Sequence, residues 1–370
     1  LPRECASALL VAPKQNLYPA MSNTNYTIPP KPAQCSGYSM IELVISSMLL
    51  AMMIGAVASL SVSGGQAQEY SRRLSRVTQI TQQTIDDLRL ELVSSVRIFS
   101  NDVEGNANLS LLDLDDIPEP LDDMLLPTVS ENDIIRPDTV GNEITGNSLF
   151  FAKFAWTDRF ECSSSNEYLV DVYRWVYYYL SPEDGGPDPS HAIGLNIVRV
   201  SSEPMIDAGS VDRIEDPDDQ KEVLLHLFYG TPDADGVTHD KAEVVWLRGG
   251  LPAVLGTLRH IDGTDGSLSD TPLYPRLETW NVMREDEAVT GLLSYRHHSV
   301  ASNYARDSFG VGRYAIESTS GGGFPHGLEI QVVGPSSARQ VLIHMVNSST
   351  QRTGQFAWSR MQLAVDARDL

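Results

Sequence analysis

A single apolar run near the amino end constrains the fold of this chain more than any other feature. It extends over the 23 residues from Met40 to Val62 and contains one charged side chain, Glu42. At 1.5 Å per residue, an α-helix of this length is about 34 Å long, which is enough to cross the roughly 30 Å hydrocarbon layer of a membrane. The sequence has no second run of this kind. It therefore predicts one membrane-spanning helix.

Glu42 is the unexplained residue of this run. A charge in the hydrocarbon layer costs about 2.5–3.5 kcal/mol at the centre of a helix and less near its end, so it ordinarily has a function and a partner. Two ordinary interpretations of the run leave Glu42 unexplained. One is a plain signal anchor, and the other is a secretory signal that is cleaved after Ala58, at the small residues Ala56-Val57-Ala58.

A third interpretation explains the acid. The stretch Gly37-Tyr38-Ser39-Met40-Ile41-Glu42-Leu43, followed by apolar residues, resembles the processing site of type IV pilins and of the pseudopilins of type II secretion. The resemblance implies that a prepilin peptidase cleaves after Gly37 and methylates the new amino terminus, Tyr38. It also implies that Glu42 pairs with the terminal amine of a neighbouring subunit in a filament. An ammonium and a carboxylate attract each other far more strongly in a low-dielectric environment than in water.

The same resemblance implies an α+β fold, in which a long amino-terminal helix packs on a carboxyl-terminal antiparallel β-sheet head. Residues 1–37 would be the leader peptide, with Met21 as an alternative start, and residues 38–62 the transmembrane part of the helix. The chain would be a structural subunit and not an enzyme. It would sit in the bacterial inner membrane with its head in the periplasm and then enter a pilus or pseudopilus. Its partners would be the peptidase, other pilin or pseudopilin subunits, the membrane and, indirectly, an assembly platform and ATPase.

Residues 63–100 predict an amphipathic continuation of the helix. Apolar side chains recur at spacings of three and four, and Pro and Gly are absent from Gln66 to Phe99. The stripe consists of Tyr70, Leu74, Val77, Thr81, Ile85, Leu88, Leu92, Val96 and Phe99. Two glycines, Gly64 and Gly65, lie at the junction with the apolar run, where they predict either a flexible joint or an exposed turn.

Residues 101–147 predict an acidic connector. Twelve Asp or Glu side chains stand there against one Arg136, and four prolines interrupt any long helix. The expected structure is a solvated loop.

Residues 148–370 predict a β-rich globular head, because the apolar period changes from 3.6 to 2. The first strands are expected at Ser148–Trp156, Tyr168–Leu180, Gly194–Val200, Glu222–Tyr229 and Ala242–Leu247. Near the carboxyl end, segments around Leu328–Val332, Val341–Met345 and Met361–Asp366 predict a three-stranded antiparallel meander with one buried face. The stretch FPHGLEIQVVGPSSARQVLIHMV resembles the late hairpin of J-type pseudopilins and related large minor pilins.

Composition and motifs exclude several classes of function. The net charge is −22, and it is −24 after Gly37, so the chain repels phosphate backbones and no nucleic acid is expected as a partner. Only Cys162 lies beyond the apolar run, so that part has no intramolecular disulfide. We find no hydrolase, zinc-protease, redox or nucleotide-binding motif. The alternation of Tyr173, Trp175, Tyr177 and Tyr179 favours core packing, with a carbohydrate or protein contact surface as the alternative.

Two acidic loops are candidates for calcium. Asp233, Asp235 and Asp240 lie around Gly236, and Asp262, Asp265 and Asp270 lie around Gly263 and Gly266. Calcium takes six to eight oxygen ligands, which closely spaced aspartates can supply in part. Acidic hairpin turns have the same composition, so the loops leave both possibilities open. The rival function for the whole chain is a secreted or anchored β-rich binding protein with an ordinary signal sequence.

Overall fold

The computed structural model describes residues 39–115, 117–120, 124–132, 145–182, 195–248, 258–269, 275–281, 299–300, 327–350 and 356–369. The helices are α1 (Met40–Val93), α2 (Val103–Leu109), α3 (Ala208–Val211), α4 (Pro217–Tyr229) and the 3-10 turn η4 (Ser336–Ala338). The strands are β1 (Ser95–Phe99), β2 (Val129–Ser130), β3 (Leu149–Glu161), β4 (Glu167–Pro182), β5 (Leu195–Ser202), β6 (Met205–Asp207), β7 (Val244–Trp246), β8 (Leu258–Ile261), β9 (Leu268–Ser269), β10 (Leu277–Asn281), β11 (Ser299–Val300), β12 (Leu328–Val333), β13 (Arg339–Thr350) and β14 (Phe356–Ala367).

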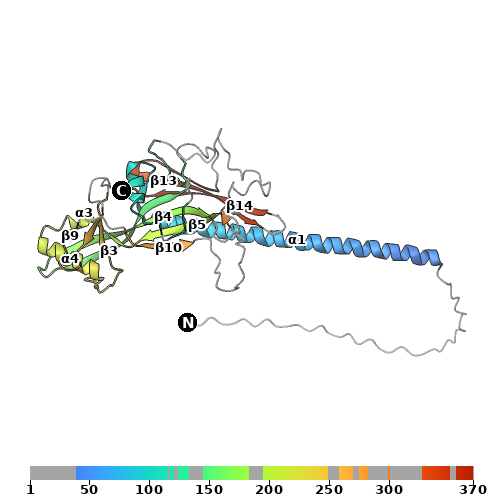
Figure 1. Cartoon of the computed structure of the whole chain (residues 1–370), viewed down its shortest axis with the longest axis horizontal. Coiled ribbons are helices and arrows are strands. Elements are labelled where there is room, and N and C mark those ends of the chain that lie inside the picture. The colour runs from blue at the N-terminus through green and yellow to red at the C-terminus, as the bar shows by residue number, and fades with distance from the viewer. Residues whose placement is uncertain are drawn as a thin grey trace, which may run out of the picture. The chain divides into compact units, whose positions relative to one another are not determined.

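The architecture is mixed α+β, as the sequence predicts. A long amino-terminal helix with an apolar first half precedes a sheet that is mainly antiparallel (Figure 1). Among the described residues, α1 is the one helix whose length and composition suit a membrane span. The chain divides into two compact units, Leu1–Ser63 and Gly64–Leu370.

Helix α1 differs from the prediction at two places. It continues without a break through Gly64 and Gly65, so the exposed turn expected there is wrong. It also ends at Val93, whereas the stripe predicted a helix up to Phe99. The last residues of the stripe belong to β1, which pairs antiparallel with β3. Val, Ile and Phe in SVRIF favour a strand. Pairing with β3 provides hydrogen-bond partners for the backbone of this segment, in place of the bonds that a further helical turn would provide.

The strands form one 14-stranded sheet within the described part of the chain. Its main path runs β2-β12-β13-β11-β5-β4-β6-β7-β8-β9, and β14, β10, β3 and β1 pair beside this path. The pairs β2/β12 and β6/β7 are parallel, and the other pairs are antiparallel. The sheet therefore joins the carboxyl-terminal strands to those that follow α1.

Alternate residues of β4 contribute to two hydrophobic cores, because successive side chains of a strand point to opposite faces. One core joins β4 to the carboxyl half of α1; its members from these elements are Val176, Tyr178, Leu180, Ile85, Leu88 and Leu92. The other core takes the alternating aromatic residues Tyr173, Trp175, Tyr177 and Tyr179. These four rings are at most 5% exposed, so they pack in the core and do not form a contact surface.

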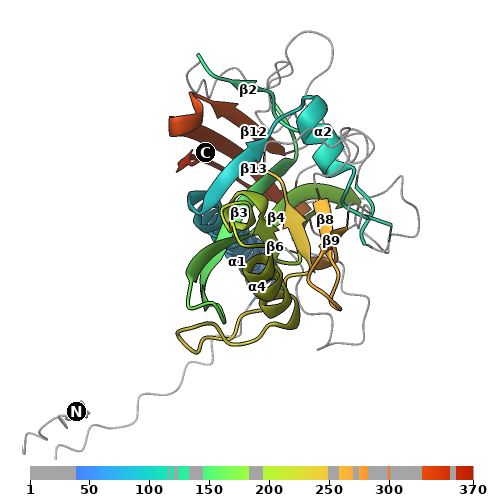
Figure 2. The same ribbon diagram turned by 90° about the vertical axis from the view of Figure 1, so that its left-hand side faces the viewer.

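The strand predicted at Glu222–Tyr229 is wrong, because this segment belongs to helix α4. Asp216 caps the helix by accepting from the Asp218 N–H, Pro217 occupies its first turn, and Gly230 ends it with a φ of 61°. These are ordinary signals for the start and end of a helix. Val223, Leu224 and Leu227 are buried in a third core with residues of β6, β7 and β8, and α4 contacts β8; both elements are labelled in Figure 2.

The connector is more ordered than the predicted solvated loop, within its described residues. Asp102 accepts a hydrogen bond from the Gly105 N–H at 2.7 Å and so caps α2. Leu112 and Leu126 are buried in the aromatic-rich core, and β2 pairs with β12. The acidic composition predicted a solvated loop, but scattered apolar side chains pack this segment on the sheet.

The predicted carboxyl-terminal meander of β12, β13 and β14 is confirmed, but the prediction that only one of its faces is buried is wrong. Glu329 and His344, on the face opposite the core, are each about 2% exposed. His344 Nδ1 lies 2.7 Å from Glu329 Oε2, and Arg360 Nε donates to His344 Nε2 at 2.8 Å. The three strands each contribute one polar side chain to this network, which gives partners to Glu329 Oε2 and to both ring nitrogens of His344, whereas Glu329 Oε1 has no hydrogen-bond partner.

Candidate functional site

The amino end of α1 carries a reciprocal capping arrangement around Glu42. The backbone N–H of Ser39 donates to Glu42 Oε2 at 2.9 Å, and the N–H of Glu42 donates to Ser39 Oγ at 3.3 Å. This is a capping box, in which the two side chains accept from two backbone donors at a helix start. The Glu42 N–H also donates to the Ser39 carbonyl at 3.0 Å. The Ser-x-x-Glu spacing signals the capping box, and the sequence-based prediction missed that signal. Gly37 and Tyr38 lie outside the described residues.

The apolar half of α1 presents its side chains outward on every face. All large apolar side chains from Met40 to Val62 are more than half exposed. Monomeric soluble proteins rarely expose a contiguous apolar surface of this extent. This exposed apolar surface is therefore expected to be covered by lipid or by other protein chains.

The other half of α1 is tied to the sheet by the carboxylate of Glu91. Arg199 of β5 donates from Nε at 2.9 Å and from Nη2 at 2.7 Å, Tyr178 of β4 donates at 2.5 Å, and Lys153 of β3 donates as well. Burial alone raises the pKa of Glu91, but the bonds from Arg199, Lys153 and Tyr178 outweigh it and lower this pKa to about 2. One carboxylate on α1 thus links three strands. Its partners are 62 to 108 residues away in sequence, so no local pattern indicates them.

The three aspartates of the first candidate calcium loop already have other partners. Asp233 Oδ1 accepts from the N–H groups of Asp235 and Val237, as in an acidic turn. Asp235 pairs with Arg159 at 2.8 Å, and Asp240 pairs with Arg174 at 2.6 Å. The three aspartates are therefore not brought together as one set of oxygen ligands.

The second candidate loop is also a turn. Asp262 Oδ1 accepts from the N–H and hydroxyl of Thr264 at 2.8 and 2.6 Å, and Asp265 Oδ1 accepts from the Ser267 N–H at 2.9 Å. The bonds from Thr264 and Ser267 lower the pKa values of these two carboxyls. Asp270 lies outside the described residues.

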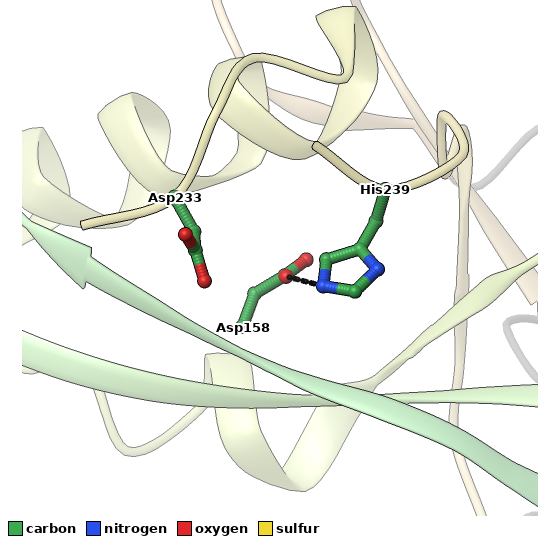
Figure 3. A group of neighbouring side chains, drawn as sticks. All are labelled: Asp158, Asp233 and His239. Atoms are coloured by element: carbon green, nitrogen blue, oxygen red, sulfur yellow. Dashed lines mark ion pairs between the residues drawn. The ribbon is translucent and has the colours of Figure 1, made fainter. Parts of the chain in front are cut away.

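Asp233 instead meets two residues that the calcium prediction did not include. Asp158 of β3, Asp233 and His239 each offer a ligand atom, and these three atoms lie within 4.8 Å of one another (Figure 3). Asp158 Oδ1 lies 3.3 Å from His239 Nε2 and has no hydrogen bond, although the residue is only 4% exposed. Burial raises the pKa of Asp158, and the Asp233 charge adds to this against the opposing effects of Trp156 and His239.

A second cluster of possible ligands is internally satisfied. Asp219 of α4 accepts hydrogen bonds from Ser164, Asn166 and Tyr168, which fasten the β3–β4 turn to the helix. Cys162 lies beside Asp219, and its pKa is raised to about 11 by burial and then by the neighbouring carboxylates. The sulfur therefore stays a thiol at neutral pH, which makes it a poor metal ligand or nucleophile.

Comparison of the chain with protein-family models, with curated proteins and with solved structures found no match.

Proposed function

We propose that the chain is a minor pilin or pseudopilin, a structural subunit of a type IV pilus or of a type II secretion pseudopilus. A prepilin peptidase cleaves the precursor after Gly37 and methylates Tyr38. The apolar half of α1 then holds the subunit in the bacterial inner membrane, with the head in the periplasm, until an assembly platform and ATPase move it into the filament. Catalysis belongs to those other chains.

The observation that carries the proposal is the placement of Glu42. It lies in the first turn of a 54-residue helix, three residues after Ser39 of the Gly-Tyr-Ser sequence and at the start of an exposed apolar surface. Packing of this helix against neighbouring subunits would cover that surface. The neighbour's terminal ammonium would meet Glu42 in an environment of low dielectric constant, where an unpaired carboxylate is costly.

The capping box suggests how Glu42 can serve both its own helix and a neighbour. Oε2 accepts the Ser39 N–H, which leaves Oε1 to face a second donor. Capping requires only an acceptor, and glutamine also provides one, whereas pairing with an ammonium across subunits requires the negative charge. The two roles can therefore be separated by substitution.

We expect Glu42→Gln and Glu42→Ala to leave the precursor inserted and cleaved but to reduce its incorporation into filaments. Ser39→Ala is the matched control, because it removes the other half of the capping box at a cost of about 0.5–2 kcal/mol without altering charge. The measurement is the amount of each variant in purified filaments relative to the membrane fraction of the native host. Equal incorporation of Glu42→Gln and wild type would reject intersubunit pairing. Equal loss in Ser39→Ala and Glu42→Ala, with no loss in Glu42→Gln, would assign Glu42 a capping role only.

A further inference from the structure

The group of Asp158, Asp233 and His239 contains a buried acceptor without a donor. Asp158 is 4% exposed, and its Oδ1 atom has no hydrogen-bond partner. A buried polar atom left without a partner is destabilising, and more so when it is charged. The nearest possible partner of Asp158 Oδ1 is His239 Nε2, 3.3 Å away. It stabilises the buried oxygen only if Nε2 carries a proton or if a cation lies between the two atoms.

The neighbouring side chains hold these ligand atoms in position. The Trp156 indole N–H donates to Asp158 Oδ2 at 2.9 Å, which leaves Oδ1 facing the other two residues. The Trp156 ring also stacks on the His239 ring, with centroids 4.8 Å apart and planes 10° apart. Both hydrogen bonds from the loop backbone to Asp233 fall on Oδ1, so Oδ2 remains available. Such supporting contacts are typical of sites that bind metal ions.

The donor set selects among cations. One imidazole nitrogen and two carboxylates suit zinc and similar first-row divalent ions, whereas calcium takes six to eight oxygens. Four-coordinate zinc, with ligands about 2.0–2.1 Å away, has neighbouring ligand atoms roughly 3.3 Å apart. The distance from Asp158 Oδ1 to His239 Nε2 matches this spacing, and the third ligand atom lies within 4.8 Å.

We propose that Asp158 Oδ1, Asp233 and His239 Nε2 bind a divalent cation of the zinc class, with water completing its coordination. Asp158 belongs to β3, whereas Asp233 and His239 belong to the segment between α4 and β7 (Figure 3). The ion fixes this segment to β3, next to the backbone bond from the Ala234 N–H to the Arg159 carbonyl. The proposal goes beyond the filament role and does not depend on it.

The test is calorimetric titration of zinc chloride into the metal-free, untagged full-length chain in detergent micelles. We expect one zinc ion per chain, and affinity reduced by about 100-fold or more in both Asp158→Asn and His239→Gln. The matched control is Asp235→Asn, which changes the same loop and breaks an exposed ion pair outside the site. It should bind zinc as wild type does. Zinc should also raise the unfolding temperature of wild type but not that of His239→Gln.

Asp158 is buried, so Asp158→Asn can fail to fold; His239, whose side chain is 29% exposed, then carries the test. Cobalt(II) provides an independent readout, because a tetrahedral site that includes His239 gives intense visible absorption that the His239→Gln variant loses. Absence of zinc binding to wild type would show that His239 and Asp158 form an ion pair only. Undiminished binding in His239→Gln, equal loss in Asp235→Asn, or tighter binding of calcium than of zinc would each overturn the proposal.

Discussion

Replacing Glu91 by glutamine is expected to lower the free energy of unfolding at pH 7 by about 3–5 kcal/mol, the cost of breaking a buried ion pair by removing one partner. The substitution keeps the size of the side chain but leaves Arg199 and Lys153 without their counter-ion. The drop in the pKa of Glu91 from 4.5 to about 2 corresponds to about 3 kcal/mol, in agreement with this range. Urea unfolding of the full-length chain in detergent, followed by tryptophan fluorescence, measures the difference.

The effect of Glu91 on stability should depend on pH in a defined direction. Its pKa is lower in the folded protein, so its contribution is fully present above about pH 4.5 and disappears as the pH falls to about 2. The difference between wild type and Glu91→Gln should narrow over that interval. Glu69→Gln is the control on the same helix, because Glu69 forms a more exposed pair with Arg73 worth about 0.3–0.5 kcal/mol. A Glu91→Gln cost no larger than that of Glu69→Gln would contradict the assigned role.

The second large effect is expected at Gly37. Gly37→Glu should abolish processing, because it places a large charged side chain at the proposed cleavage site. Immunoblots of the native host should show only the uncleaved precursor of this variant, whereas Ser36→Ala should be cleaved like wild type. Normal cleavage of Gly37→Glu would exclude a prepilin peptidase as the processing enzyme.

The parts of the fold that were predictable have strong local signals. The long helix and the final meander follow from apolar periods of 3.6 and 2, and the structure has both. In α4 two signals conflicted: aromatic and branched residues favoured a strand, but Asp216-Pro217 and Gly230 bounded a helix. The capping residues were the better guide. Residues 95–99 form β1 and do not continue the helix, because they pair with β3, and this long-range contact cannot be read from the sequence.

The polar sites were less predictable because their members are distant in the chain. Glu91 meets Arg199 across 108 residues, and Asp158 meets His239 across 81 residues. The sequence indicated the loop that holds Asp233 and left calcium binding and an acidic turn open, and the hydrogen bonds to Asp233 are those of an acidic turn. Only the fold places a histidine and a strand aspartate beside one of these loop residues.

The amino-terminal residue of the mature protein tests the filament proposal most directly. Mass spectrometry of the amino-terminal peptide from the native host should find N-methylated Tyr38, which would keep Glu42 and the whole apolar half of α1 in the mature subunit. Ser59 as the dominant terminus would remove Glu42 and release the protein as a secreted one, which would contradict the proposal. A terminus before Gly37 would also contradict it and would identify the apolar run as a plain anchor.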